Sequence, residues 1–120
     1  MDNPTIFGKI INGQIPAKKL FEDGEVLAFH DIQPVAEVHF LIIPKKFIPT
    51  LADATSADTA LLGKMLALVP VLAAQQGLTG GFRTAINTGK QGGQEVYHLH
   101  IHVFGNRPGG EPLRTIAGKA

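Results

Sequence analysis

His98-Leu99-His100-Ile101-His102-Val103-Phe104 is the most informative part of the chain, because histidine alternates in it with apolar residues. Side chains on a β-strand point alternately to the two faces of the sheet. If these residues form a strand, His98, His100 and His102 share one face and the apolar residues share the other. The apolar face would pack on a core, and three imidazoles would line the opposite face at steps of about 6.6 Å.

In two interpretations of this histidine cluster, no histidine acts as a nucleophile. One is chance spacing on an exposed strand, although three of the chain's five histidines fall on one face within five positions. The other is a zinc site, since histidine is the commonest metal ligand. Zn–N bonds of about 2.0–2.1 Å require the ligand nitrogens to converge. The Cβ atoms of His98 and His102 would lie about 13 Å apart on a regular strand, so two histidines would share a metal more easily than all three.

The third interpretation is nucleophilic catalysis by the middle histidine, His100. A neutral imidazole can attack phosphorus and form a covalent intermediate. It needs the correct tautomer and donor groups around the phosphoryl oxygens, and the flanking histidines could supply both. The glycine-rich loop at 89–93 precedes the motif and could offer backbone N–H groups to an anion, although alone it is more simply a turn.

The remaining pattern predicts strands before and after one long helix. Residues 38–43 are a nearly continuous run of apolar residues, several of them β-branched. Such a run is typical of a central strand buried on both faces, and Pro44 would end that strand. Asp23-Gly24 is a hairpin turn signal between two shorter strands. The five predicted strands are Lys19–Glu22, Val26–His30, 38–43, 82–87 and 96–105. Short turns between most of them favour an α+β fold with a five-stranded antiparallel sheet.

Two helices are predicted. The apolar residues Ile6, Phe7, Ile10 and Ile11 have helical spacing and indicate a short N-terminal helix that stops at Gly13. The long helix would cover 56–76. Thr55 and Asp58 form a capping-box pattern at its start, and Gly77 would be its left-handed stop.

The middle of the long helix has no polar face. Residues 65–74 include no polar side chain, and Pro70 among them should kink the helix or split it in two. A single sheet can cover only one side of such a helix. The tail, 107–120, is rich in glycine and proline and reads as loosely held, and it has too few apolar residues to cover the other side. The same helix of a second copy would cover it with a single self-complementary surface, which predicts a homodimer.

Composition limits the classes of protein that fit. The 120 residues make one domain, with 44% apolar and 18% charged residues, which excludes a disordered chain. The absence of cysteine excludes disulfides, thiol nucleophiles and thiolate metal sites. Eleven basic against ten acidic residues leave no charge excess for binding a nucleic acid polymer. We expect no signal peptide, no membrane-spanning segment and a cytoplasmic protein.

Residues 98–104 fit the signature His-φ-His-φ-His-φ-φ, with φ apolar, of the histidine triad (HIT) proteins, and the chain resembles that family over most of its length. Four further segments, in the right order, are similar to the Hint branch, the purine nucleoside phosphoramidases. They are Thr5-Ile6-Phe7-Gly8-Lys9-Ile10-Ile11, Phe29-His30-Asp31-Ile32, His39-Phe40-Leu41-Ile42-Ile43-Pro44-Lys45-Lys46 and Gly92-Gly93-Gln94-Glu95-Val96-Tyr97-His98. The resemblance implies a HIT-like fold, a homodimer, no cofactor or metal, and hydrolysis of the P–N bond of purine nucleoside phosphoramidates.

The resemblance also implies catalytic roles for four histidines. His100 would attack the α-phosphorus and leave a nucleotidyl-imidazole that water hydrolyses. His102 would hydrogen-bond the phosphate or the leaving group. His98 would orient His100, with His39 behind it as a relay, although His39 alone reads as a satisfied core histidine.

The remaining implied roles concern a purine nucleotide resembling AMP or GMP. Asp31 would take the ribose hydroxyls, although by itself it reads as a turn residue. Glu95 stands where many eukaryotic members carry serine, and its carboxylate could attract an ammonium on the leaving group. The full set of implied binding residues is Asp31, Ile32, Asn87, Gly93, Gln94, Glu95 and Val96, with a base pocket made by Ile6, Phe7, Ile10, Ile15, Phe29 and His30.

Two rival functions remain open at this stage. One is a nucleotide-binding interaction protein whose hydrolysis is vestigial. The other is a metal-binding protein or metal-dependent enzyme that uses the histidine cluster.

Overall fold

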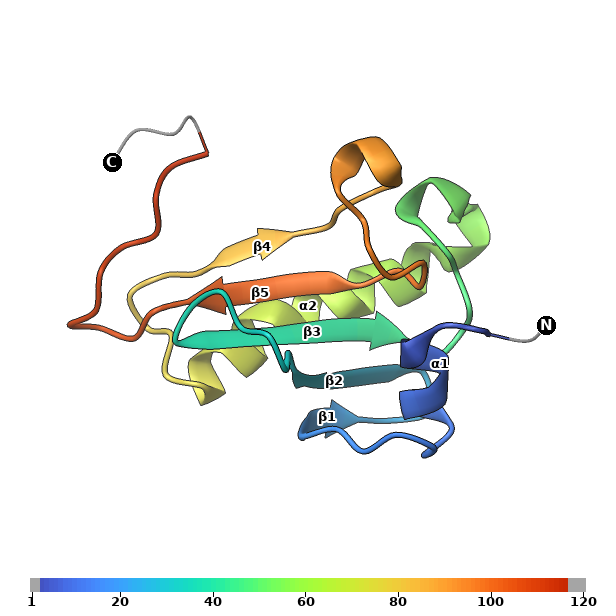
Figure 1. Ribbon diagram of the computed structural model, residues 1–120, viewed down its shortest axis with the longest axis horizontal. Coiled ribbons are helices and arrows are strands. Elements are labelled where there is room, and N and C mark those ends of the chain that lie inside the picture. Colours follow the sequence, from blue (N-terminus) through green and yellow to red (C-terminus); the bar gives the residue numbers. More distant parts are fainter. Residues whose placement is uncertain (1–2, 117–120) are drawn as a thin grey trace.

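The computed structural model describes residues 3–116 and shows one antiparallel sheet in the order β1-β2-β3-β5-β4 (Figure 1). The helices are α1 (Ile6–Ile11) and α2 (Thr59–Gln75), and the strands are β1 (Lys19–Glu22), β2 (Val26–His30), β3 (Val38–Pro44), β4 (Arg83–Ala85) and β5 (Ile101–Gly105). Three single-turn 3₁₀ helices are η1 (Leu51–Asp53), η2 (Ser56–Asp58) and η3 (Lys90–Gly92). The predicted α+β class, with five antiparallel strands and one long helix, is confirmed.

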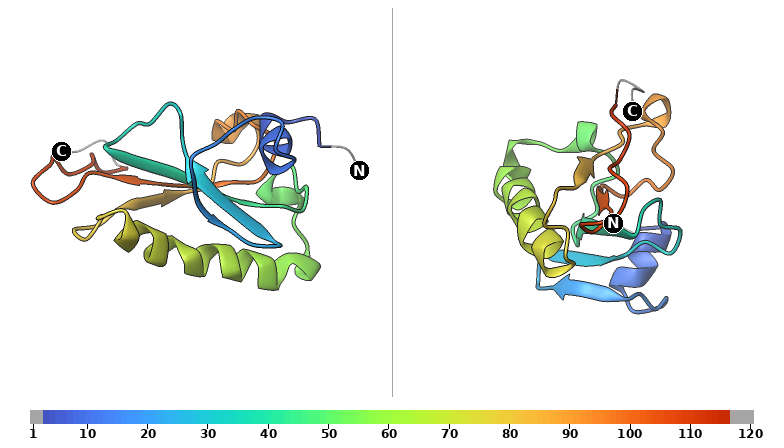
Figure 2. Two further views of the ribbon diagram at one scale, coloured as in Figure 1. Left: turned by 90° about the horizontal axis from the view of Figure 1, so that it is seen from below. Right: turned by 90° about the vertical axis from the view of Figure 1, so that its left-hand side faces the viewer.

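The sheet lies between two layers. Figure 2 shows α2 along one face of the sheet, while α1 and the loops after β2 and β4 gather on the other. The core beneath α2 takes every second residue of the central strands, among them Phe40 and Ile42 of β3 and Val103 of β5. A smaller core beneath α1 takes the alternate residues, among them Leu41. The alternation of β3 thereby confirms the prediction of a strand buried on both faces.

This alternation decides where the histidines of the sheet lie. Because Val103 faces α2, its neighbour His102 faces the α1 layer. On β3, Phe40 is buried beneath α2, so its neighbour His39 likewise faces the α1 layer. The register pairs Leu41 with His102 and His39 with Phe104, so the imidazoles of two neighbouring strands lie diagonally adjacent on one face.

The long helix begins and ends close to the predicted positions. The capping box of Thr55 and Asp58 is present, but it caps η2, which leads directly into α2. Gly77 follows the helix with φ +85°, the left-handed conformation that favours glycine. Pro70 lies inside α2 and does not split it, so the expected division into two helices is wrong. Pro70 is exposed, so the carbonyl that loses its partner faces water and the helix continues.

One side of α2 remains uncovered in the described structure. Met65 and Val69 are buried against the sheet, whereas Leu66 and Val71 are each 51% exposed on the opposite side. By length and hydropathy alone, the helical stretch Ser56–Gln75 would suffice to cross a membrane, but Met65 and Val69 of this helix are buried against the sheet. The core helix of a domain like this one passes the same test.

Two strands are shorter than predicted. Strand β4 covers Arg83–Ala85 rather than 82–87. Strand β5 begins at Ile101 rather than at residue 96, because the backbone bends over 96–98 and pairs with β3 only from Ile101 onward. The expectation of three histidines on one regular strand is therefore wrong, since only His102 lies on β5.

Candidate active site

A cavity of about 460 Å³ opens on the sheet face that carries α1. It brings together most of the residues that the sequence implicates, from several separate segments of the chain. Those that line it are Ile6, Phe7, Ile10, Ile15, Phe29, His30, Asp31, Ile32, His39, Asn87, Gly93, Glu95, Val96, His100 and His102. Because His39, His100 and His102 share this cavity with apolar residues, it can hold a ligand with a charged part and an apolar ring.

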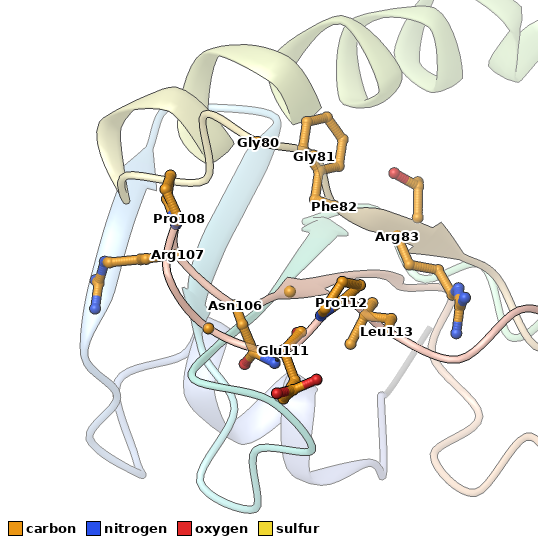
Figure 3. A pocket seen from close by; sticks show the side chains of 13 residues that line it. Gly80, Gly81, Phe82, Arg83, Asn106, Arg107, Pro108, Glu111, Pro112 and Leu113 are labelled. Atoms are coloured by element: carbon orange, nitrogen blue, oxygen red, sulfur yellow. Dashed lines mark hydrogen bonds between the residues drawn. The ribbon is translucent and has the colours of Figure 1, made fainter. Parts of the chain in front are cut away.

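A second cavity, of about 510 Å³, lies between the start of β4 and the tail (Figure 3). No histidine lines it. Its two arginines already bond to main-chain carbonyls, Arg83 to Arg114 and Arg107 to Gln76. His39, His100 and His102 line the first cavity instead.

His100 is held in one tautomer by the main chain. Its Nδ1 lies 2.7 Å from the carbonyl oxygen of His98. A carbonyl only accepts, so Nδ1 carries the proton and Nε2 keeps its lone pair. Burial lowers the pKa of His100, and the ring packs edge-on against Phe7 with centroids 5.1 Å apart. His100 is therefore a neutral imidazole with a free nucleophilic nitrogen near neutral pH.

His39 and His102 are hydrogen-bonded to each other, and their other contacts decide which ring donates and which accepts. The backbone N–H of Val35 donates to Nδ1 of His39 at 3.2 Å, so Nε2 of His39 carries the proton. That Nε2 lies 2.9 Å from Nδ1 of His102, which must accept. The remaining N–H of His102 is then on Nε2, as a donor for a ligand in the cavity. Burial is the main reason that the pKa of His102 falls to about 4 and that the pKa of His39 is lowered.

This pairing corrects one implied contact. His39 touches His102, not His98, because β3 and β5 are neighbours and His98 precedes β5. His98 does not line the cavity at all. It is completely buried behind His100, and its Nε2 lies 2.7 Å from the carbonyl of Pro44. Its carbonyl, rather than its ring, makes the contact with His100.

Asp31 has the turn role weighed for it, and it also lines the cavity. One carboxylate oxygen accepts from the backbone N–H of Gln33 at 2.8 Å, which is the turn role. The other lies 3.5 Å from Nε2 of His39, at the wall of the cavity. The side chain is 20% exposed, so this oxygen can still meet a ligand.

These geometric features are accompanied by a match to a protein family. Residues 12–109, most of the chain, match the HIT domain. The chain belongs to the HIT domain family. A HIT-like protein of Synechococcus elongatus is 56% identical over 107 residues, which are 89% of this chain and 94% of that protein. Protein HitA of Neisseria gonorrhoeae is 54% identical over 105 residues, 88% of this chain and 97% of that one.

Solved structures are similar to this one over most of the chain. A HIT family hydrolase from Legionella pneumophila Philadelphia 1 is 46% identical with a TM-score of 0.82, covering 88% of this chain and 98% of that one. A histidine triad protein from Clostridium difficile is 38% identical with a TM-score of 0.86, covering 96% and 98%. The chain thus resembles HIT family hydrolases in both sequence and fold.

Gln94 is the second implied residue of this HIT domain that does not line the cavity. It is buried, and its amide donates to the carbonyls of Pro49 and Val96, each at 2.9 Å. Its oxygen accepts from the N–H of Gly89 at 2.8 Å. All its groups are used within the protein, so the side chain fixes the glycine-rich loop instead of reaching a phosphate. Gly93 next to it has φ +80°, a conformation that requires glycine.

The HIT domain also places one potential metal-binding group in the cavity. One ligand atom each of Asp31, His39 and His102 lies within 4.8 Å of the others. A metal would need the lone pair of Nε2 of His39, whereas the Val35 N–H already occupies Nδ1. Both nitrogens cannot accept in a neutral imidazole, so the tautomer of His39 argues against a resident metal.

Sequence reasoning missed five lining residues: Pro16, Ala17, Gln33, Val35 and Leu41. Leu41 could have been found, because it lies two residues after His39 and so shares its face of β3. The loop residues Gln33 and Val35 carry no such signal, since no periodicity governs a loop.

Proposed function

We propose that this HIT domain protein is a nucleotide-binding hydrolase that cleaves the P–N bond of purine nucleoside phosphoramidates. Adenosine 5′-phosphoramidate and substrates resembling aminoacyl adenylates are the expected compounds. The observation that carries the proposal is the tautomer of His100, because its Nδ1–H is held by the His98 carbonyl and its Nε2 lone pair is free beside a nucleotide-sized cavity.

The first step would form a nucleotidyl-imidazole. Nε2 of His100 attacks the α-phosphorus, the P–N bond breaks, and the nitrogen leaves as an amine with one proton from solvent. The imidazole becomes positively charged, and the His98 carbonyl already accepting from Nδ1–H stabilises that charge. The Nε2–H of His102 would donate to a phosphoryl oxygen.

The second step would regenerate the enzyme. Water attacks the phosphorus, the bond to Nε2 of His100 breaks, and the nucleoside monophosphate leaves. Water gives up one proton, which balances the proton taken by the amine. His100 returns to the neutral tautomer that the fold selects.

Nucleotide binding would divide between the two kinds of lining residue. The apolar side chains of Ile6, Phe7, Ile10, Ile15 and Phe29 would enclose the base, and Asp31 would accept from the ribose hydroxyls. Glu95 is exposed at the cavity and would attract a cationic leaving group. We further propose a homodimer that covers the exposed side of α2, and a cytoplasmic location.

One substrate comparison distinguishes the proposed hydrolase from the alternative, a nucleotide-binding protein with vestigial hydrolysis. Turnover of adenosine 5′-phosphoramidate and of diadenosine polyphosphates is measured for wild type and His100→Ala, with EDTA present. We expect metal-independent turnover of the phosphoramidate that His100→Ala abolishes, while AMP binding persists. Faster hydrolysis of the dinucleotide, or equal activity of the two proteins, would refute the proposal.

A further inference from the structure

Asn3, in the segment before α1, joins that segment to His98, the most deeply buried member of the histidine triad. Its side-chain Nδ2 lies 2.7 Å from Nδ1 of His98, 95 positions away in the chain. The ring of His98 is completely buried, and its other nitrogen faces the carbonyl of Pro44 at 2.7 Å. Both polar atoms of the His98 ring are thus engaged by parts of the protein distant in sequence.

The orientation of the Asn3 amide is fixed by its other contacts. Its Oδ1 accepts from the backbone N–H of Thr5 at 3.1 Å and from the Thr5 hydroxyl at 2.7 Å. A backbone N–H can only donate, so the oxygen must be on that side and the NH₂ must face His98. Asn3 therefore donates, and Nδ1 of His98 accepts.

The same tautomer follows from the opposite side of the ring. The carbonyl of Pro44 accepts only, so Nε2 of His98 must carry the proton. Two independent partners thus select a neutral His98 with its proton on Nε2. Protonation of Nδ1 would point an N–H at the Asn3 NH₂ and bring two donors together.

Gly8 provides the space for this contact. A Cβ at Gly8 would lie 2.5 Å from Cγ of Asn3 and 2.7 Å from its main-chain oxygen. Glycine inside a helix costs about 1 kcal/mol relative to alanine, so helix formation does not explain it. Asn3 and Gly8 both lie outside residues 12–109, which match the HIT domain.

We propose that Asn3 is a positioning residue that fixes the tautomer and orientation of His98 and, through the His98 carbonyl, the proton on Nδ1 of His100. The consequence for catalysis rests on the proposed function, whereas the consequence for the two imidazoles does not. The chain of contacts is Asn3 Nδ2–H to His98 Nδ1, and His100 Nδ1–H to His98 O. The hydrogen bonds of the His98 ring stabilise the backbone bend at 96–98, which directs the His98 carbonyl toward Nδ1 of His100.

The test uses the full chain with Asn3→Ala, Asn3→Asp and Gly8→Ala, and with Lys9→Gly as the matched control. Lys9 is exposed on α1, so Lys9→Gly weakens the helix without touching Asn3. Nitrogen-15 NMR of the imidazoles reports the tautomers of His98 and His100. Steady-state kinetics on adenosine 5′-phosphoramidate report kcat and KM.

Asn3→Ala should release His98 into a mixture of tautomers and speed exchange of the His100 Nδ1 proton. It should lower kcat about 3- to 10-fold, as loss of one neutral hydrogen bond would, with KM changed less than twofold. Gly8→Ala should act in the same direction because it displaces Asn3, and Lys9→Gly should do neither. Asn3→Asp should raise the pKa of His98, because a carboxylate would accept from a protonated Nδ1. Among residues 3–116, the ring otherwise faces Phe7, Phe47 and the Pro44 carbonyl, and His100 is the titratable group that acts on its pKa.

Unchanged imidazole spectra in Asn3→Ala would overturn the inference, as would an equal effect of Lys9→Gly. A wild-type protein that does not hydrolyse the phosphoramidate would refute the proposed function alone, because the NMR result still decides whether Asn3 positions His98.

Discussion

The stability of this protein should fall steeply in mild acid because of the buried histidines, and His102 allows the effect to be measured. The perturbation is a change from pH 7 to pH 4 in wild type and in His102→Asn. An asparagine oxygen can accept from Nε2 of His39 as Nδ1 of His102 does, but it does not titrate. The variant therefore removes the protonation and keeps the hydrogen bond.

The magnitude follows from the pKa of His102. Burial, with the neighbouring His100 and His39, lowers that pKa from 6.5 to about 4. The unfolded chain binds the proton near pH 6.5 and the folded protein does not until about pH 4, so stability is complete above pH 6.5 and is lost as pH falls through that window. At about 1.4 kcal/mol per pKa unit, the loss is at most about 3 kcal/mol, and water in the open cavity reduces it toward about 2 kcal/mol.

The assay is urea unfolding followed by far-UV circular dichroism at one protein concentration, since the chain has no tryptophan. The free energy of unfolding of wild type should fall by about 2–3 kcal/mol more than that of His102→Asn between pH 7 and pH 4. Parallel pH dependence in the two proteins would refute the reasoning, and so would an NMR titration midpoint of His102 near 6.5.

Three further predictions concern binding and assembly. Asp31→Ala should weaken AMP binding by about 1–3 kcal/mol in calorimetry, and an unchanged Kd would leave Asp31 as a turn residue only. Glu95→Gln should reduce kcat/KM for a phosphoramidate with a cationic amine leaving group but not for one with a neutral leaving group, and an equal effect on both would exclude the carboxylate as a selector. Leu66→Asp should dissociate or aggregate a homodimer because Leu66 is half-exposed on α2, whereas wild type sedimenting near 12.8 kDa would show that no dimer forms.

The sequence predicts the sheet well where periodicity is strong. Strands β1 and β2 have the predicted bounds, and β3 ends at Pro44 as expected. The prediction of a regular strand over residues 96–105 is wrong because alternation persists through the bend at 96–98, where His98 bonds to Pro44. Alternation of apolar residues indicates that the two sides of a segment differ in environment. A bent segment between the core and the cavity shows the same alternation as a regular strand.

The resemblance to the HIT family identified most of the residues that line the cavity, but it did not give the contacts of each side chain. Gln94 follows two glycines, as a phosphate-binding residue would, yet its amide is consumed by three main-chain groups. The pairing of His39 with His102 depends on the order of β3 and β5 in the sheet. That order is a long-range property, and no local pattern in the sequence contains it.

The central claim, that His100 is the nucleophile, is tested most directly by trapping the intermediate. Wild type mixed with adenosine 5′-phosphoramidate is quenched in alkali within the first turnover, because phosphoryl-histidine survives base, and is mapped by mass spectrometry. We expect one nucleotidyl group on His100 at a level that rises and decays with turnover, and none in His100→Ala. Turnover with no adduct at any time, or an adduct on another residue, would contradict the account.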